Sequence, residues 1–482
     1  MKGFISFLLG IVLFLNLSFV KAFEQLSLEE AISLALIHNP EIQSIYWDRL
    51  VSLSDYQLQK KRFVPQLALE MAGGIQQERS TAHEDTTLFR AYPTIEMMTP
   101  LGTQLKLITE AAAHDSHQSE RNQKHNDQSL TVLIKQPLTK GLSPKVNQWP
   151  ILNAQMNHEI ALLNFKRTVE TVVLQLISEF IDFQQMLNRQ TLQKQYLSQA
   201  EHLFELLEAK YQDGRIAQND LIPPKLQIKQ AKQAILQSQI ELKRKRKILF
   251  ETIGIEDQGQ WIDSKIKKKS FSQEGISFEQ VISNDLALKS LEMNENRLKK
   301  EIEVIKDDQK LDVYLQGDVH LGRSHYHTYE KLFEYGYYHS LPFHNKGYTA
   351  SVNVNIPLGR KPLYQHQLLV QKSAIEKNKL DILKRHQTLS AEYESLKDSL
   401  HIKNAQLALM KEEVDLAKLD YSSALEKYNS GRIAIIEVTR AKAQWHTLEL
   451  NLTDAELMRQ QLEMQLDWLA GCLLEKWNVK LH

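Results

Sequence analysis

The segment YQDGRIA at 211–217 recurs as YNSGRIA at 428–434, and each copy follows a very long stretch without glycine or proline. These two stretches cover residues 151–213 and 363–430. At about 1.5 Å per residue, each would form a helix of roughly 95 to 100 Å, far longer than a globular helix. Glycine at the fourth position of each copy can adopt the positive φ that ends a helix. The repeated segment therefore predicts the turn that follows a long helical rod, formed twice.

Apolar residues in both rods follow helical spacing. In the first rod, one stripe recurs at steps of three and four and consists of Val169, Val172, Val173, Leu176, Ile177, Phe180 and Ile181. In the second rod, the spacing of a coiled-coil seam is kept by Tyr393, Leu396, Leu400, Leu407, Met410, Val414, Ala417, Tyr421, Ala424 and Tyr428. Both patterns favour helices that pack along much of their length.

A returning helix is predicted after each turn, over 226–253 and over 435–470. Gly254 and Gly471 close these helices, and their separation equals that of the two turn glycines. The repeat also aligns Lys225 with Lys442 and Gln227 with Gln444. The sequence therefore predicts two matching helical hairpins, each with its tip at the quoted turn.

Upstream of each rod, the apolar period changes from helical to two, which is typical of strands with one apolar and one polar face. Four such runs are predicted as strands: 67–71, 130–134, 313–321 and 348–358. The last run is long enough for a tilted membrane strand. The polar segments 114–128 and 323–339 lie between strands and suit loops at an outer surface.

Each half of the chain also opens with a short helix. Ser27 and Ser277 are predicted N-caps, with Glu30 and Gln280 completing capping boxes. The domain organisation that follows is listed in chain order: signal peptide 1–22, first structural repeat 23–254, inter-repeat linker 255–275, and second structural repeat with C-terminal tail 276–482. The signal is predicted from Lys2, the apolar run that follows it and the small-residue cleavage pattern ending at Ala22. An uncleaved anchor is the alternative.

The composition excludes several classes of protein. Basic and acidic residues balance at 59 each, so nothing favours nucleic acid as a partner. Cys472 is the single cysteine, so no intramolecular disulfide can form in the oxidising compartment that the signal implies. No Walker loop, GxSxG or GxGxxG motif is present, and we expect neither an enzyme nor a cofactor.

Four strands cannot close into a membrane barrel, because bacterial single-chain barrels need at least about eight. Open edges in lipid would leave backbone groups unpaired, so other copies of the chain must pair them. Residues 89–108 could add a further hairpin, and six strands would still need partners. Three copies of four strands would give twelve.

The ordered set of motifs resembles the TolC-type outer-membrane efflux protein family over residues 26–471. The set comprises the paired turns, Asn39-Pro40, VPQLAL before the first strand, QPLTKG at 136–141, and the closing Gly254 and Gly471. The resemblance implies a homotrimer with a long α-helical periplasmic barrel continuous with a 12-stranded β-barrel in outer-membrane lipid. It also implies a periplasmic adaptor protein and an inner-membrane transporter as partners. The implied function is the exit duct of a tripartite efflux pump or a type I secretion system.

The resemblance assigns a role to the periplasmic tip. Asp220 and Glu437, six residues after the turn glycines, would form an acidic constriction that gates the pore. Arg440 could pair with Glu437 and weaken that ring. The remaining tip residues, which would shape the turns, hold the closed tip or meet the adaptor, are Tyr211, Gly214, Arg215, Tyr428, Gly431 and Arg432. A purely structural role for all of them is the alternative.

Two further patterns have ordinary explanations. Histidines gather in or beside the predicted outer loops, and imidazoles can bind Zn²⁺, Cu²⁺ or Ni²⁺, but no spacing specifies a metal site: His83, His114, His117, His125, His320, His325, His327, His339 and His344. Aromatic residues at 326–338 suit either an interfacial girdle or a surface loop. The rival class is a periplasmic coiled-coil adaptor or scaffold without a pore, which would not need duplicated strands.

Overall fold

The computed structural model describes residues 25–79, 83–117, 121–257, 259, 261–262, 276–330, 333–340, 345–356, 359, 361–477 and 479. The chain divides into two compact units. The helical unit comprises Met1–Asp48, Leu162–Lys289 and Leu383–His482, and the sheet unit comprises Arg49–Ala161 and Ser290–Ile382. Each unit takes segments from both predicted repeats, so the repeats of the sequence are not the compact units in space.

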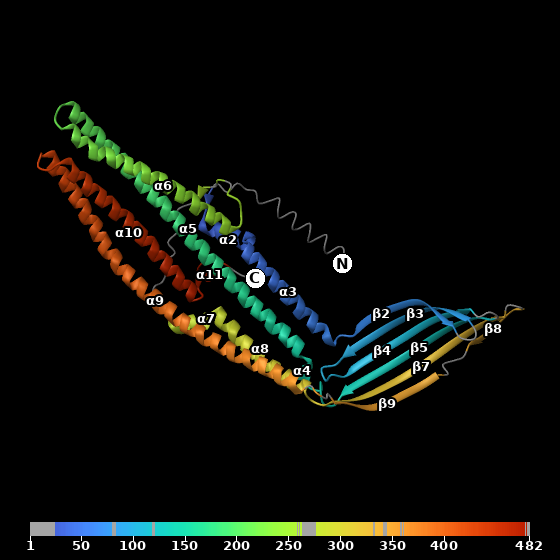
Figure 1. Cartoon of the computed structure of the whole chain (residues 1–482). Helices are drawn as coiled ribbons and strands as arrows, with labels where there is room; N and C mark the ends of the chain where they lie inside the picture. The colour runs from blue at the N-terminus through green and yellow to red at the C-terminus, as the bar shows by residue number, and fades with distance from the viewer. Residues whose placement is uncertain are drawn as a thin grey trace. The chain divides into compact units, whose positions relative to one another are not determined.

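Long helices dominate the chain (Figure 1). The α-helices are α2 (Leu28–His38), α3 (Pro40–Lys60), α4 (Pro144–Asn147), α5 (Trp149–Gln212), α6 (Ile222–Ile253), α7 (Phe278–Asn284), α8 (Leu286–Asp308), α9 (Lys361–Asn429), α10 (Ile435–Leu469) and α11 (Leu473–Lys476). Two 3₁₀ helices are η1 (Lys61–Phe63) and η2 (Gln218–Leu221). In the described part of the chain, no helix combines the length and the apolar character needed to cross a membrane.

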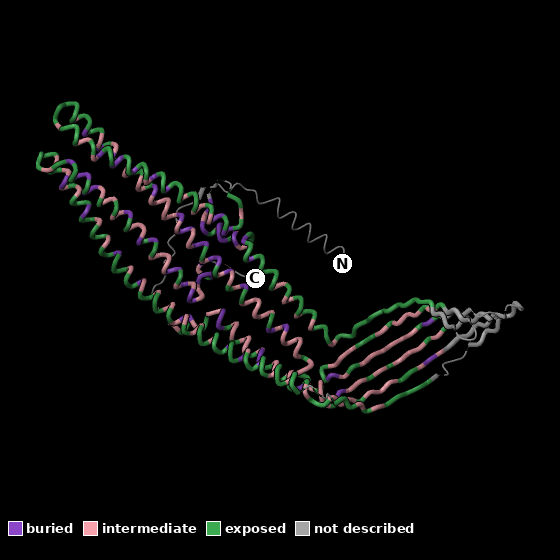
Figure 2. Tube along the Cα trace, in the orientation of Figure 1, coloured by how far each residue is buried: buried purple, intermediate pink, exposed green. Residues whose placement is uncertain are grey.

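The core of the helical unit forms around the predicted stripe of α5. Every residue from Val169 to Ile181 that belongs to the stripe is at most 1 % exposed. The stripe packs against α2 and the end of α6, and Figure 2 shows buried residues gathered on these helices. Phe183 lies off the stripe and is also buried, because α5 contacts neighbours on more than one side. The helical period of the sequence thus predicted this core correctly.

The two predicted capping boxes are present. The Glu30 amide donates to Ser27 Oγ at 3.3 Å, and the Ser27 amide donates to Glu30 Oε2 at 2.9 Å. Ser277 and Gln280 repeat the pair with both distances at 3.3 Å. Each box satisfies backbone donors that the first helical turn leaves unpaired. These contacts fix where α2 and α7 begin.

A joint at Asn39 fastens the end of α6 to the start of α3. Asn39 Oδ1 accepts hydrogen bonds from the amides of Glu41 and Ile42, so Asn39 caps α3. Asn39 Nδ2 donates to the Thr252 carbonyl at 2.7 Å. Gly254 ends α6 at φ 85° and lies so close that a Cβ there would be 2.3 Å from the His38 carbonyl oxygen.

The second repeat rebuilds this joint with different residues. Asn284 Nδ2 donates to the Ala470 carbonyl at 2.9 Å, and Gly471 adopts φ 71° beside it. Asp285 Oδ1 accepts from the Leu288 amide at 2.6 Å and so caps α8, as Asn39 caps α3. Arg385 Nη2 lies 2.6 Å from Asp285 Oδ2. Both repeats therefore close with a glycine packed against the residue that ends the opening helix.

The sheet unit contains one antiparallel sheet beside helical segments. Its strands are β2 (Gln66–Arg79), β3 (His83–Met98), β4 (Gln104–His117), β5 (Arg121–Pro137), β7 (Asp312–Glu330), β8 (Phe333–Ser340) and β9 (Asn345–Asn355). Their order is β2-β3-β4-β5-β7-β8, and β9 also pairs with β7 (Figure 1). Because β8 pairs with the later half of β7 and β9 with the earlier half, these two strands share one position in the sheet. A separate parallel pair joins β1 (Gln25–Leu26) to β6 (Trp261–Ile262).

The four predicted strands are present as β2, β5, β7 and β9, and the possible hairpin at 89–108 is also formed, as β3 and β4. The chain thus supplies more strands than the four counted from the sequence. Pro93 lies within β3, and proline lacks the N–H for a ladder bond. In the structure Pro93 interrupts the β3–β4 ladder, and its carbonyl accepts instead from Thr109 Oγ1 at 3.0 Å.

Some predictions lie outside the described residues. The signal peptide 1–22 is one, and most of the linker 255–275 is another. The predicted loops 114–128 and 323–339 are wrong where the structure describes them, because these residues continue the strands β4, β5, β7 and β8. Of the histidines predicted in or beside those loops, His344 falls outside the described residues, and His320 is the one whose side chain is described. The side chains of the aromatic residues at 326–338 are likewise not described.

Candidate functional site

The two repeated turns have the same backbone hydrogen bonds. At the first, the Gly214 amide donates to the Tyr211 carbonyl and the Arg215 amide to the Lys210 carbonyl, both at 2.9 Å. At the second, the Gly431 amide donates to Tyr428 and the Arg432 amide to Lys427, again at 2.9 Å. This is the Schellman motif, which needs a left-handed residue after the helix. The glycines meet that need at φ 69° and 75°.

A shared apolar cluster packs the two turns against each other within the helical unit. Its buried members are Leu203, Leu207, Ala424, Ile435, Val438 and Ala441. Partly buried Ile216 and Ile433, from the repeated segment itself, pack against this cluster. The isoleucine that follows each arginine therefore anchors its turn. The sequence repeat is explained by this packing as well as by the turn geometry.

The predicted acidic pair occupies two different environments. Asp220 Oδ2 accepts the Ala217 amide at 3.0 Å, so this carboxylate caps η2. Glu437 lies in the first turn of α10, where Arg440 Nη1 approaches its Oε2 at 3.9 Å. Both Glu437 and Arg440 are more than half exposed. The predicted pairing of Arg440 with Glu437 is thus present, and the positive charge of Arg440 lies beside the Glu437 carboxylate.

The two arginines of the turns do not bridge the hairpins. Arg215 Nε lies 3.7 Å from Asp213 of its own turn, and its side chain is 72 % exposed. Arg432 forms no ion pair with any residue in the described ranges. Besides the apolar cluster, a cation–π contact joins the turns, in which Lys210 Nζ lies 4.7 Å from the ring centroid of Tyr428. Burial, and then the charge of Asp220, raises the pKa of Tyr428.

Sequence analysis missed a belt of buried polar and aromatic side chains behind the tip. The Tyr196 ring from α5 stacks on His446 of α10 at 4.2 Å, and its hydroxyl accepts from Gln227 Nε2 of α6. Lys442 is only 3 % exposed and lies over the Tyr421 ring at 5.8 Å. The belt thus joins α5, α6, α9 and α10. The one sequence signal was the alignment of the two lysines and the two glutamines between repeats.

Matching residues of the two repeats differ in burial at this belt. Lys442 and Gln227 are buried, whereas their counterparts Lys225 and Gln444 are exposed. Burial lowers the pKa of Lys442 to about 8. Burial, and then the charge of Lys442, lowers the pKa of His446 to about 4. An ammonium group is therefore buried at neutral pH, and its loss of hydration costs stability.

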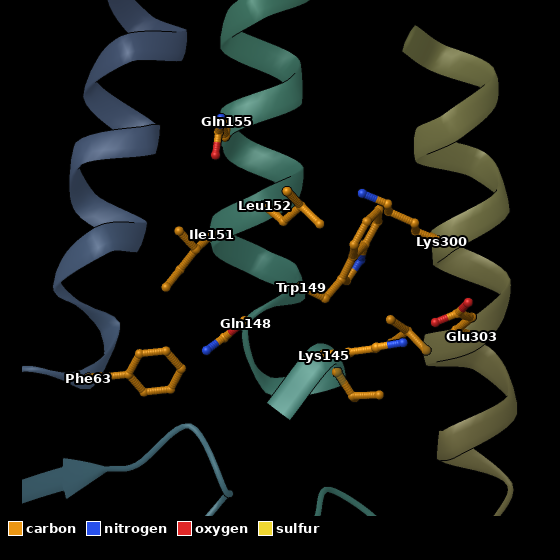
Figure 3. A pocket seen from close by; sticks show the side chains of 11 residues that line it. Phe63, Lys145, Gln148, Trp149, Ile151, Leu152, Gln155, Lys300 and Glu303 are labelled. Atoms are coloured by element: carbon orange, nitrogen blue, oxygen red, sulfur yellow. The ribbon is translucent and has the colours of Figure 1, made fainter. Parts of the chain in front are cut away.

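A cavity of about 550 Å³ lies in the sheet unit (Figure 3). Trp149 and Leu152 of α5 face it from one side, and Lys300 and Glu303 of α8 face it from the other. The lining combines apolar surface with separated charges and brings together no nucleophile and base. Among the described residues, no cluster of three histidine, cysteine or acidic side chains could hold a metal ion.

Two long helical hairpins together with an antiparallel sheet define a TolC-like channel protein. A family model for the outer membrane efflux protein matches residues 31–254 and 278–472. The chain belongs to the outer membrane efflux protein family. The predicted family and fold class are therefore confirmed. As a member, the protein lies in the outer membrane, and its helical part extends into the periplasm.

Solved structures show the same fold. Crystal structures of CusC, described as undergoing transmembrane channel formation, match with TM-score 0.68 and 13 % identity over 93 % of both chains. The outer membrane protein VceC of Vibrio cholerae matches with TM-score 0.66 and 12 % identity over 92 % of this chain and 96 % of its own. The Campylobacter jejuni CmeC outer membrane channel gives 0.66 and 11 % over 92 % and 86 %. A comparison with curated proteins returns no match.

Proposed function

We propose that three copies of this chain form the exit duct of a tripartite efflux pump or a type I secretion system, gated at its periplasmic tip. The duct conducts passively and performs no chemistry. A periplasmic adaptor and an inner-membrane transporter would supply the cargo and the energy. Family membership supports this role. The main structural support is a feature of the sheet that a soluble helical protein would not need.

That feature is an apolar sheet face that is left exposed while both sheet edges lack partners. Leu67 of β2 is 76 % exposed and Tyr348 of β9 is 87 % exposed, although both side chains belong to the apolar face. Within the described residues, β2 pairs only with β3, and β9 pairs only with β7. Membrane sheets cannot leave edges open, so neighbouring copies supply the missing strands and lipid covers the apolar face.

The gate is proposed at the start of the returning helices. Asp220 and Glu437 each lie six residues after a turn glycine, and in a three-copy assembly each would be repeated around the axis. A ring of carboxylates favours cations. Arg440 beside Glu437 reduces that preference, so this gate would be weakly selective. Arg215 and Arg432, both at the exposed turns, are the proposed contacts of the adaptor.

A periplasmic adaptor or scaffold is the rival function, and it predicts a different location and mass. The full chain should fractionate with the outer membrane and migrate in detergent as a heat-dissociable trimer. Deleting the gene should then raise accumulation of a fluorescent dye in cells if the duct serves efflux, or abolish a secreted protein if it serves type I secretion. A soluble periplasmic protein with neither effect would contradict the proposal.

A further inference from the structure

We infer that the cavity between α5 and α8 binds one anionic phospholipid of the outer membrane in each copy of the chain. Lys145 and Lys300 hold the phosphate of the head group, and the upper part of one acyl chain lies against Trp149 and Leu152. The site goes beyond the exit duct proposed above, because passive conduction does not require a bound lipid.

The lining of the cavity combines an apolar wall with two cations. Its volume of about 550 Å³ falls in the range of roughly 300–1,000 Å³ that is usual for ligand sites. Phe63, Trp149 and Leu152 supply apolar surface, and Lys145 and Lys300 extend their ammonium groups into the same space (Figure 3). Neither lysine forms an ion pair with any residue in the described ranges. A ligand with an acidic head and an apolar body matches this lining.

The charge around the cavity also favours an anion. Among the described residues that line it, Glu303 is the one acidic side chain, against two lysines. The basic run KKR at 60–62 leads directly into Phe63, and no acidic residue lies between Asp55 and Glu70. Basic clusters beside membrane-spanning segments, and basic pockets between their helices, bind the head groups of anionic lipids.

The cavity lies where the helices of the sheet unit meet its strands. β2 begins at Gln66, three residues after Phe63, which is about 10 Å at roughly 3.3 Å per residue. β7 begins at Asp312, eight residues after Val304 of the lining. Because the strands carry the apolar face that lipid covers, the cavity lies at the level of the periplasmic head groups. Tryptophan and lysine are typical of that level, where an apolar body and a polar tip are both satisfied.

Exposed apolar side chains continue from the cavity along the same end of the sheet. They flank the strand ends, and each is at least 40 % exposed: Val64, Leu101, Leu138, Leu142 and Leu311. Val64 directly follows Phe63 of the lining. Acyl chains that leave the cavity therefore meet further apolar surface. A small hydrophilic anion would need no such surface, so a phospholipid fits the site better than free phosphate.

Native mass spectrometry of the full-length protein tests the site. Protein purified in dodecyl maltoside is incubated with phosphatidylglycerol or with phosphatidylcholine of the same acyl chains. We expect one phosphatidylglycerol per copy and little phosphatidylcholine. Equal retention of both lipids would overturn recognition of an anionic head group. Equal retention of oleate, an acidic amphiphile without a phosphate, would overturn the assignment to a phospholipid.

Charge variants locate the head group. Lys145→Gln with Lys300→Gln should weaken phosphatidylglycerol binding about thirtyfold, since each lysine contributes about 1 kcal/mol and about 1.4 kcal/mol is tenfold. The matched control removes two lysines of α8 outside the lining, Lys299→Gln and Lys306→Gln, and should bind like the parent protein. Glu303→Gln should strengthen binding, because it removes a negative charge beside the phosphate. Equal weakening in the two double variants would show a response to net charge alone and would overturn the site.

Trp149 reports on the acyl chain. Bromine on the upper acyl carbons of phosphatidylglycerol quenches tryptophan fluorescence on contact. In nanodiscs of this lipid, Trp149→Phe should lose part of the quenched emission, and the double variant at Lys145 and Lys300 should lose the same part. An unchanged quenched fraction in Trp149→Phe would overturn the placement of the chain and leave the exit-duct function intact. If the double variant does not fold, Trp149→Phe and the lipid preference of the parent protein still decide.

Discussion

Replacing Gly254 and Gly431 by alanine separates two roles of a helix-ending glycine. Both residues have positive φ, at 85° and 75°. Alanine in that conformation costs about 1–2 kcal/mol. At Gly431 no atom lies within 4 Å of the new Cβ, so this conformational cost is the whole effect of the substitution on stability. The loss of stability at the tip should therefore stay near 1–2 kcal/mol.

At Gly254 the new Cβ also meets backbone that cannot rotate away. It would lie 2.3 Å from the His38 carbonyl oxygen and 3.1 Å from the Asn39 Cα. Overpacking of this kind typically adds about 1–3 kcal/mol. Any shift that relieves it lengthens the hydrogen bond from Asn39 to Thr252, which contributes about 1 kcal/mol. Gly254→Ala should therefore destabilise the protein by about 3–6 kcal/mol.

The assay is loss of helical circular dichroism on heating full-length protein in detergent, with all variants at one protein concentration. Gly254→Ala should lower the midpoint well below that of Gly431→Ala. Gly214→Ala is the matched control, because its φ is 69° and its surroundings are open, so it should behave like Gly431→Ala. Equal shifts at Gly254 and Gly431 would refute the close packing of α6 against the end of α2.

Three further predictions concern the tip and the belt behind it. Neutralising Glu437 and Arg440 together should raise single-channel conductance in a planar bilayer. Because an exposed ion pair contributes about 0–1 kcal/mol, the fraction of open channels should change by at most about fivefold. Unchanged conductance would count against a gate at these residues. Lys442→Met removes a buried charge and should raise the melting midpoint, whereas Lys225→Met, at the exposed matching position, should leave it unchanged. Because the folded protein holds the pKa of His446 near 4, below its ordinary value of 6.5, the unfolded chain binds the proton first, so stability should fall as pH drops from about 6.5 to 4. His446→Gln should flatten that dependence, and an unchanged slope would refute the assignment.

The sequence by itself determined the features that depend on neighbouring residues along the chain. The lack of glycine and proline set the two rods, and Gly214 and Gly431 set their ends, because local backbone geometry decides where a helix can continue. Apolar period set the buried stripe around Phe180, and two capping boxes set the starts of α2 and α7. These features follow from local sequence, so they could be predicted without knowing the fold.

Only the tertiary structure decided which residues at equivalent positions differ in burial and packing. Lys225 and Lys442 occupy matching positions, yet only Lys442 is buried, where it lies over the Tyr421 ring of α9. Gly254 and Gly431 share a conformation, yet only the first is packed against another backbone. Pro93 interrupts the β3–β4 ladder, and its carbonyl accepts a hydrogen bond from the Thr109 hydroxyl of β4. Each outcome depends on residues distant in sequence that pack beside the site, so no local pattern contains it.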